Sequence, residues 1–235
     1  MINVIALLGP LLGPGRWEIG NDGRINPAKR VLSPDKPFRS ANLIKHGYDC
    51  SWEMDVLFEV VYRMKLVPIR CLSCYKVLLK PTTLADVYRI EAFQQAGDYP
   101  CKVGMEIRPT VKRPWGAYWY TNSIEEGRER FREIRDWAKH GLFDDWSILL
   151  KRGCTEYEQA VGPSDAWEQE AGQVAIEAAV HHGVNHEPLV ADQPPSIVEN
   201  LHEQWEKWEE IMKPYVTYHE KQEDIRRRKQ MEERG

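Results

Sequence analysis

The sequence lacks the short motifs that identify the commonest enzyme sites. It contains no Gly-rich phosphate-binding loop, no His-Glu-x-x-His pair and no paired carboxylates in a recognisable setting. It also has no apolar run near the roughly 20 residues that a membrane helix needs, and its apolar N-terminus has no early positive charge. We therefore expect a cytoplasmic binding protein rather than an enzyme or a membrane protein.

Cysteine is scarce, and its spacing argues against a disulfide framework. The 235 residues include 5 cysteines, and two of them form the sequence Cys71-Leu-Ser-Cys74. A Cys-x-x-Cys pair in an intracellular chain indicates metal binding or redox chemistry. A thioredoxin-like role fits less well, because that motif opens a helix, whereas this pair is predicted to lie between two strands.

The net charge of −4 hides a strong asymmetry along the chain. Between Arg24 and Arg113, 16 Lys and Arg residues accompany 9 Asp and Glu residues, whereas from Gly153 onward 8 basic residues accompany 18 acidic ones. This pattern indicates a basic body with an acidic appendage. We divide the chain into an extended N-terminal arm at 1–48, an α+β domain at 49–160 and an acidic α-helical C-terminal appendage at 161–235.

The stretch from Cys101 to Asn122 predicts a β-hairpin. Val103, Met105 and Ile107 alternate with polar residues, and four aromatic residues follow a Lys-Arg-Pro break. Alternation at period two indicates half-buried strands, and a short break between two of them indicates a hairpin. The phase of the second strand leaves open which pair faces outward, Trp115 and Trp119 or Tyr118 and Tyr120.

Helices and further strands are predicted on both sides of this hairpin. Apolar residues at helical spacing predict an amphipathic helix over 51–65. A second helix is predicted between its capping residues Thr83 and Gly97, and the capping box Ser123-Ile-Glu-Glu126 begins a third. Strands are predicted at 67–70, 75–80 and 146–150. From Tyr75 onward this order predicts a ferredoxin-like βαββαβ antiparallel sheet with both helices on one face.

This topology predicts a zinc site at one edge of the sheet. The first and second strands begin there and the fourth ends there, so Cys74, Cys101 and Cys154 should meet. The turn between the strands at 67–70 and 75–80 would form a zinc knuckle, giving a closed and therefore structural site. The predicted ligands of the Zn²⁺ ion are Cys71, Cys74, Cys101 and Cys154, with Cys50 or His46 as a substitute for one of them. The alternative is that these thiols are simply buried.

The sheet face without helices is predicted to be basic and aromatic. Such a surface can bind single-stranded nucleic acid, because bases stack on aromatic rings while Lys and Arg contact phosphates. The predicted contact residues are Lys76, Lys80, Arg108, Lys112, Arg113, Trp115, Trp119 and Lys151.

The segment Arg113-Pro-Trp-Gly-Ala-Tyr-Trp-Tyr120 resembles the octapeptide on the third strand of RNA recognition motif domains. It matches that motif at the basic first residue, the aromatic third, the glycine fourth and the aromatic eighth. It differs at Pro114 and Ala117. The resemblance implies a ferredoxin-like domain that binds single-stranded RNA, with Trp115 and Trp119 as the stacking residues.

The acidic C-terminal region predicts two helices, at 164–182 and from 196 onward. The second carries an apolar seam at heptad spacing, and Pro214 should kink or end it. These helices could pack over the open sheet face, close it as a lid, or bind a protein partner or a second copy through 196–213. A structural or assembly subunit is therefore the second hypothesis, and an enzyme using Cys154 or a metal is the third.

Overall fold

The structure is a computed structural model. It describes residues 7–9, 17–21, 24–27, 42–46, 50, 52–106, 114–140, 147–184 and 193–232, and for residues 17, 27, 140, 147 and 215–232 it describes the backbone alone.

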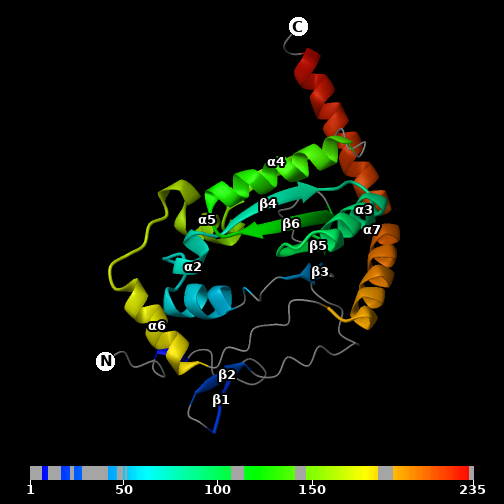
Figure 1. The fold of residues 1–235 in the computed structure, drawn as a ribbon. Helices are drawn as coiled ribbons and strands as arrows, with labels where there is room; N and C mark the ends of the chain where they lie inside the picture. Colours follow the sequence, from blue (N-terminus) through cyan, green and yellow to red (C-terminus); the bar gives the residue numbers. More distant parts are fainter. Residues whose placement is uncertain are drawn as a thin grey trace.

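A five-stranded antiparallel sheet with the order β3-β5-β6-β4-β7 forms the centre of the protein (Figure 1). Its strands are β3 (Asn42–Lys45), β4 (Tyr75–Lys80), β5 (Cys101–Met105), β6 (Trp115–Thr121) and β7 (Ser147–Arg152). β5 and β6 pair as the predicted hairpin, with Cys101 opposite Trp119. The predicted α+β class and antiparallel sheet are confirmed.

The sequence does not predict strand β3, which comes from the region interpreted as an extended arm. Leu43 lies opposite Val103, and its side chain is buried in the main core. By pairing along β5, the strand also satisfies backbone groups that a sheet edge would leave unpaired. The sheet therefore has five strands rather than four, and part of the arm belongs to the body.

Two helices cover one face of the sheet. These are α3 (Leu84–Ala96), which contacts β5 and β6, and α4 (Ile124–His140), which contacts β4, β6 and β7. Both begin at the predicted caps. The amide of Asp86 donates to Thr83 Oγ1 at 3.2 Å, and the amide of Glu126 donates to Ser123 Oγ at 3.1 Å. Each cap supplies an acceptor to an amide that lacks a partner within its helix.

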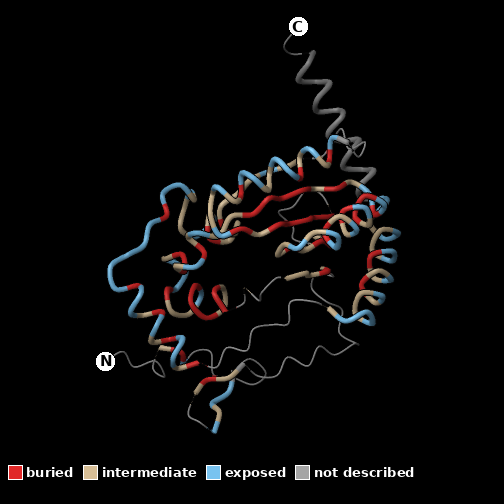
Figure 2. The backbone as a smooth tube through the Cα atoms, in the orientation of Figure 1, coloured by how far each residue is buried: buried red, intermediate tan, exposed pale blue. Residues whose placement is uncertain are grey.

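The main core lies between this face and the two helices. Alternation along β4 and β6 places Val77, Leu79, Ala117 and Trp119 in it, and both strands are buried along most of their length (Figure 2). The opposite side of the sheet, which we call the second face, therefore carries the intervening residues. Given the strand register, these include Lys76, Leu78, Lys80, Lys102, Tyr118, Tyr120 and Lys151.

The helix predicted at 51–65 is a π-helix, η2 (Trp52–Val61), rather than an α-helix. The wider coil continues at its end, where the amide of Tyr62 donates to the carbonyl of Leu57 at 2.8 Å, five residues back. The apolar residues predicted to share one face still pack together: Trp52, Val56 and Leu57 are buried in one small core, and Val60 and Val61 pack against it. Phe58, outside that set, packs into a second small core.

Short helical elements surround η2. They are α2 (Ile69–Leu72), α5 (Thr155–Val161), the 3-10 turn η3 (Ser164–Ala166) and α6 (Gln173–Gly183). The prediction of a helix at 164–182 is thus largely wrong for the first half of that range. Trp167 leaves the helical path there, and its indole donates to the carbonyl of Gly162 at 2.9 Å. Gly172, in the left-handed conformation at φ 80°, then sets the start of α6.

The last helix, α7 (Pro195–Glu232), lies beside α3 on the helical side of the sheet (Figure 1). Leu201 and Trp205 are buried in the main core, where the centroids of the Trp205 and Trp115 rings are 6.4 Å apart. The seam of α7 therefore packs against the body rather than across the second face, which removes the lid interpretation. Of the two outcomes predicted at Pro214, an end of the helix is wrong, since α7 continues through it to Glu232. Pro214 and Glu210 are exposed, so water can satisfy the carbonyl that the proline leaves without a donor.

A small hairpin completes the described fold. It consists of β1 (Trp17–Ile19) and β2 (Ile25–Pro27), which pair antiparallel. Ile25 is buried and bridges to Val184 after α6, and the Arg24 guanidinium donates to the carbonyl of Val184 at 2.9 Å. The hairpin thus packs against the end of α6.

Candidate metal centre

The Cys-x-x-Cys turn joins a helical turn to the central strand β4. The predicted strand at 67–70 does not form, because Pro68 starts α2 and its carbonyl accepts from the amide of Cys71 at 2.8 Å. The helix ends at Ser73, and the amide of Cys74 donates to the carbonyl of Cys71 at 3.3 Å. The zinc knuckle predicted between two strands is therefore replaced by a helix–strand turn that still keeps both cysteines on one bend.

Cys154 lies beside this turn, as predicted. β7 runs antiparallel to β4 with Tyr75 opposite Arg152, and the amide of Gly153 donates to the carbonyl of Cys74 at 2.8 Å. A second link is the Arg152 guanidinium, which donates to the carbonyl of Leu72 at 2.7 Å. One backbone and one side-chain hydrogen bond thus hold the end of β7 beside the end of α2.

Cys50 approaches the same place from the start of η2. Its carbonyl accepts from the amide of Met54 at 3.0 Å. The pKa of its thiol is raised to about 12, mainly by burial and to a smaller extent by the neighbouring Cys154, Glu53 and Cys74, in that order. Such charge effects are appreciable only between near neighbours. The Cys50 thiol is therefore within electrostatic range of Cys154 and Cys74.

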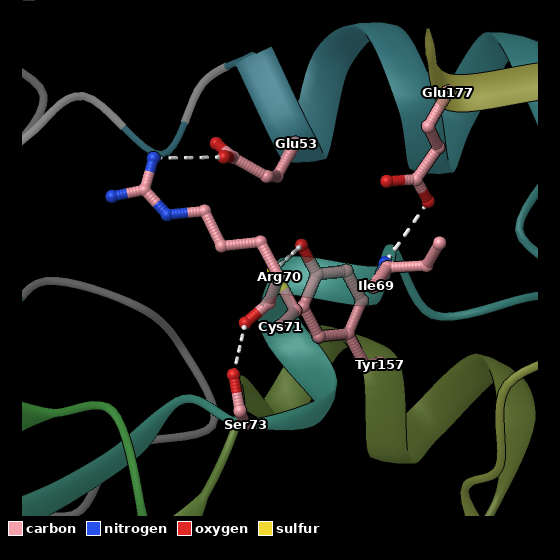
Figure 3. A network of polar contacts seen from close by, with 7 residues as sticks. All are labelled: Glu53, Ile69, Arg70, Cys71, Ser73, Tyr157 and Glu177. Atoms are coloured by element: carbon pink, nitrogen blue, oxygen red, sulfur yellow. Dashed lines mark hydrogen bonds and ion pairs between the residues drawn. The ribbon is translucent and has the colours of Figure 1, made fainter. Parts of the chain in front are cut away.

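The thiol of Cys71 is buried and contacts the Tyr157 hydroxyl at 3.3 Å (Figure 3). Burial raises the pKa of this thiol, and the tyrosine hydrogen bond opposes that effect in part. Burial also raises the pKa of Cys74, against the opposing charges of Lys76 and Arg70. Both thiols are therefore neutral at pH 7 unless a cation binds them.

Cys101 does not join this group. It lies at the predicted edge but on the other face, because it alternates with Lys102 and so shares the helical side with Val103. There it is buried in the main core opposite Trp119. The prediction that Cys101 is a ligand is therefore wrong in this geometry. His46, the other suggested substitute, pairs with Asp98 at 2.9 Å.

None of the five cysteines, all of which the structure describes, forms a disulfide bond. As the described side chains are oriented, no three of the His, Cys, Asp and Glu residues form a group that could hold a metal ion. Cys71 is turned toward Tyr157, and Cys154 contacts the Lys76 ammonium at 3.4 Å.

Two lysines on the second face lie next to the thiols. Lys76 is 8% exposed, and Lys102 is half-buried. Burial lowers the pKa of Lys102, and the charge of Lys76 lowers it further. Both ammonium groups lie over the Tyr118 ring, with Nζ of Lys102 at 4.9 Å and Nζ of Lys76 at 5.9 Å from its centroid. The Tyr118 hydroxyl in turn donates to Glu106 Oε2 at 2.7 Å.

The aromatic residues predicted to stack on bases are in the core. Trp115 is 2% exposed and Trp119 is 1% exposed, and the Trp119 ring packs at 6.2 Å from Phe93 of α3. Neither ring is available to a ligand, so this part of the prediction is wrong. The outward pair on β6 is Tyr118 and Tyr120.

The basic residues predicted to contact nucleic acid lie in different surroundings. Lys76 is buried beside Cys154, Lys80 is half-buried, and Lys151 binds Thr155 and Glu158 on α5. Three further predicted contacts lie outside the described residues, namely Arg108, Lys112 and Arg113.

Sequence reasoning missed Lys102 and Tyr157 as neighbours of the thiols. Strand alternation could have placed Lys102 on the second face. Neighbouring residues on a strand face opposite ways, and Cys101 lies on the same side as Val103. Tyr157 has no comparable signal, because its contact with Cys71 depends on how α5 folds back onto α2.

Every helix in the described part of the chain is too short or too polar to cross a lipid bilayer. Comparison of the chain with protein-family models, with curated proteins and with solved structures returns no match.

Proposed function

We propose that this protein is a non-enzymatic, zinc-stabilised binding protein, in which Cys50, Cys71, Cys74 and Cys154 supply four thiolates to one Zn²⁺ ion. The observation that carries the proposal is the backbone contact that places Cys154, after β7, beside Cys74, before β4. The charges of both thiols also act on the thiol of Cys50 at the start of η2. Cys71 is the partner of Cys74 on the same turn. An ion at this point would tie η2, the α2–β4 turn and the end of β7 together.

The chemistry of the donor set suits zinc. Four thiolates in a tetrahedral arrangement are a typical structural zinc site, and such a site leaves no open position for catalysis. Binding requires the Cys71 thiol to turn away from the Tyr157 hydroxyl. The Cys71 side chain would have to adopt another staggered position to do so.

We further infer that residues 75–152 form a ferredoxin-like unit. The support is that β4, α3, β5, β6, α4 and β7 follow one another in the chain with β4 and β6 in the middle of the sheet. Both helices lie on one face, as this arrangement requires. The edge strand β3 is an addition to it.

Cobalt substitution tests the zinc proposal. Full-length protein, purified under reducing conditions and titrated with Co²⁺, should develop the intense near-ultraviolet thiolate-to-cobalt absorption at about one ion per chain, and Zn²⁺ should displace it. Cys74→Ser should lose most of that absorption. Wild-type protein that binds neither metal would contradict the proposal.

A second candidate function is the binding of single-stranded nucleic acid, with RNA as the expected ligand, on the second face. It is favoured by one observation, the row formed by Tyr120, Lys76 and Lys151 on three adjacent strands. Tyrosine rings and lysines side by side can stack on bases and contact phosphates. The partly exposed Tyr120 would replace the buried tryptophans as the stacking residue.

Binding of a fluorescent single-stranded RNA to full-length protein tests this candidate. Affinity should fall with salt and should fall several-fold in Tyr120→Ala, because a stacked base contributes about 1–3 kcal/mol. Lys207→Ala, which removes an exposed lysine on α7 paired with Glu203, is the control and should bind as the wild type does. Equal affinities of the Tyr120 and Lys207 variants would exclude stacking on this face.

A further inference from the structure

Two lysines occupy an unusual position on the second face. Lys76 is the second residue of β4, an interior strand of the sheet, and is 8% exposed. Lys102 is half-buried on the neighbouring part of the sheet, opposite Tyr118. Lysine is almost never buried unless an anion accompanies it, because removing an ammonium group from water is costly. Two such groups side by side need an even stronger source of negative charge.

Carboxylates do not supply that charge within the described part of the chain. No Asp or Glu there forms an ion pair with Lys76 or Lys102. Glu106, the acidic residue whose charge acts on Lys102, accepts a hydrogen bond from Tyr118. The direct contact of the Lys76 ammonium is with sulfur, at 3.4 Å from Cys154. The thiols of Cys154 and Cys50 are also the first groups whose negative charge would favour the ammonium of Lys102.

The Tyr118 ring holds the two ammonium groups in place. Both lie within about 6 Å of its centroid, the range in which the ring face attracts a cation. The ring is itself fixed by the hydroxyl bond to Glu106. Lys76 is thus held between the Tyr118 ring and Cys154, and Lys102 lies over the same ring, before any ion is bound.

We propose that Lys76 and Lys102 are positioning residues of the zinc centre, which neutralise its charge and hold the Cys154 thiolate toward the ion. This inference rests on the proposed function. A divalent ion with four thiolates leaves two negative charges in excess, and the two ammonium groups match them. Lys76 donates an N–H to Cys154 Sγ, and Lys102 acts through the field across the Tyr118 ring. Groups that support metal ligands in this way contribute about 10–100-fold to metal affinity.

Competition for Zn²⁺ with a colorimetric chelator, using the full-length chain, tests this role. Lys76→Met should weaken zinc binding about 10–100-fold. Lys76→Arg keeps the charge and should stay within about 3-fold of the wild type. The matched control is Lys80→Met. Lys80 lies on the same strand and the same face as Lys76, with Leu78 between them, and its substitution should leave the zinc affinity unchanged.

Thermal unfolding separates this role from simple packing. In the zinc-loaded protein Lys76→Met should lower the unfolding temperature, whereas in the zinc-free protein it should leave that temperature unchanged or raise it, because the ammonium is then buried without its anion. An equal loss in both forms would contradict the proposal, as would zinc affinities of Lys76→Met and Lys102→Met equal to that of the wild type. If the wild-type chain binds no zinc, the proposed function itself fails, and that result is distinct from a failure of the lysines.

Discussion

Gly153 controls how Cys154 approaches Cys74. Its φ of +60° lies in the left-handed region, and its amide donates to the Cys74 carbonyl at 2.8 Å. A Cβ atom at this position would stand 2.5 Å from Cζ3 of Trp167. Only glycine satisfies both the backbone conformation and the close approach of the indole ring.

Gly153→Ala should therefore destabilise the protein by about 2–4 kcal/mol, the sum of a left-handed alanine and an overpacked ring. Gly172→Ala is the matched control, since its φ is +80° but open space surrounds the position of the added Cβ. It should cost about 1 kcal/mol. Urea unfolding of both variants measures the difference, and equal losses would show that the Trp167 contact is relieved without cost.

At the level of single residues, alternation along a strand predicts which face of the sheet each side chain occupies. The topology correctly predicted that Cys74 and Cys154 meet, because that depends only on strand direction. Whether Cys101 joins them depends on the face, and Val103 and Met105 already assign Cys101 to the core side. Cys50 could not be placed from the sequence, since its approach depends on the end of η2 rather than on a strand.

Among the elements, α7 is attached to the body by a few contacts on one stripe. Leu201 and Trp205 enter the main core, and Glu209 accepts from the amide of Leu84 at the start of α3 at 2.9 Å. His202 contacts both carboxylate oxygens of Glu91 on α3, the nearer at 2.8 Å. The helix therefore docks through a buried leucine, a buried indole and a rim of carboxylate contacts.

Trp205→Ala should destabilise the protein by about 3–5 kcal/mol, because the indole is 0% exposed and its removal leaves a cavity. Ile211→Ala, two turns further along α7 and 66% exposed, should change stability by less than about 0.5 kcal/mol. Chemical denaturation of the two variants checks this. A small effect of Trp205→Ala would mean that α7 is not part of the folded core.

The α3–α7 contact also carries a pH dependence. Burial raises the pKa of Glu91, and this outweighs the opposing effect of His202. A raised carboxyl pKa means that the folded state binds this proton more tightly than the unfolded state, so the contribution of Glu91 is most favourable below its unfolded pKa. That contribution is lost as the pH rises through the folded pKa.

Glu91→Gln removes this dependence. Its unfolding temperature, compared with that of the wild type, should therefore rise as the pH goes from about 4 to 7. Glu203→Gln on the outer side of α7 is the control, because hydrogen bonding and the charge of Lys207 lower the pKa of Glu203 instead. A relative stability of Glu91→Gln that falls over this range would contradict the assigned sign.

The sequence predicts elements best where the period is clear and the ends are capped. The hairpin and helices α3 and α4 follow from alternation and from Thr83 and Ser123. The π-helical coil of η2 and the passage of α7 through Pro214 do not follow, since both depend on packing and solvent exposure rather than on local preference. Strand β3 is too short to show a period, and its pairing with β5 is a tertiary contact.

At the scale of the whole molecule, the described part of the acidic C-terminal region contributes Leu201 and Trp205 of α7 to the main core. Deletion of residues 196–235 would remove Leu201 and Trp205 from the main core. We expect the truncated protein to lose cooperative thermal unfolding and to bind single-stranded RNA no more tightly than the full chain. A truncated protein that unfolds cooperatively and gains RNA affinity would restore the lid interpretation.

The proposed zinc ion would join two parts of the molecule. The sheet with its helices and the smaller cores around η2 meet at the α2–β4 turn, where Cys71 belongs to one of the smaller cores and Lys76 to the second face of the sheet. A bound ion would therefore link the sheet to the smaller cores around η2.

The most direct test of this account is the zinc content of two cysteine variants, measured by native mass spectrometry on full-length protein purified with zinc under reducing conditions. We predict about one zinc ion per chain for the wild type and for Cys101→Ala, and none for Cys50→Ala. A wild-type chain without zinc would contradict the account, and so would zinc that is retained in Cys50→Ala but lost in Cys101→Ala.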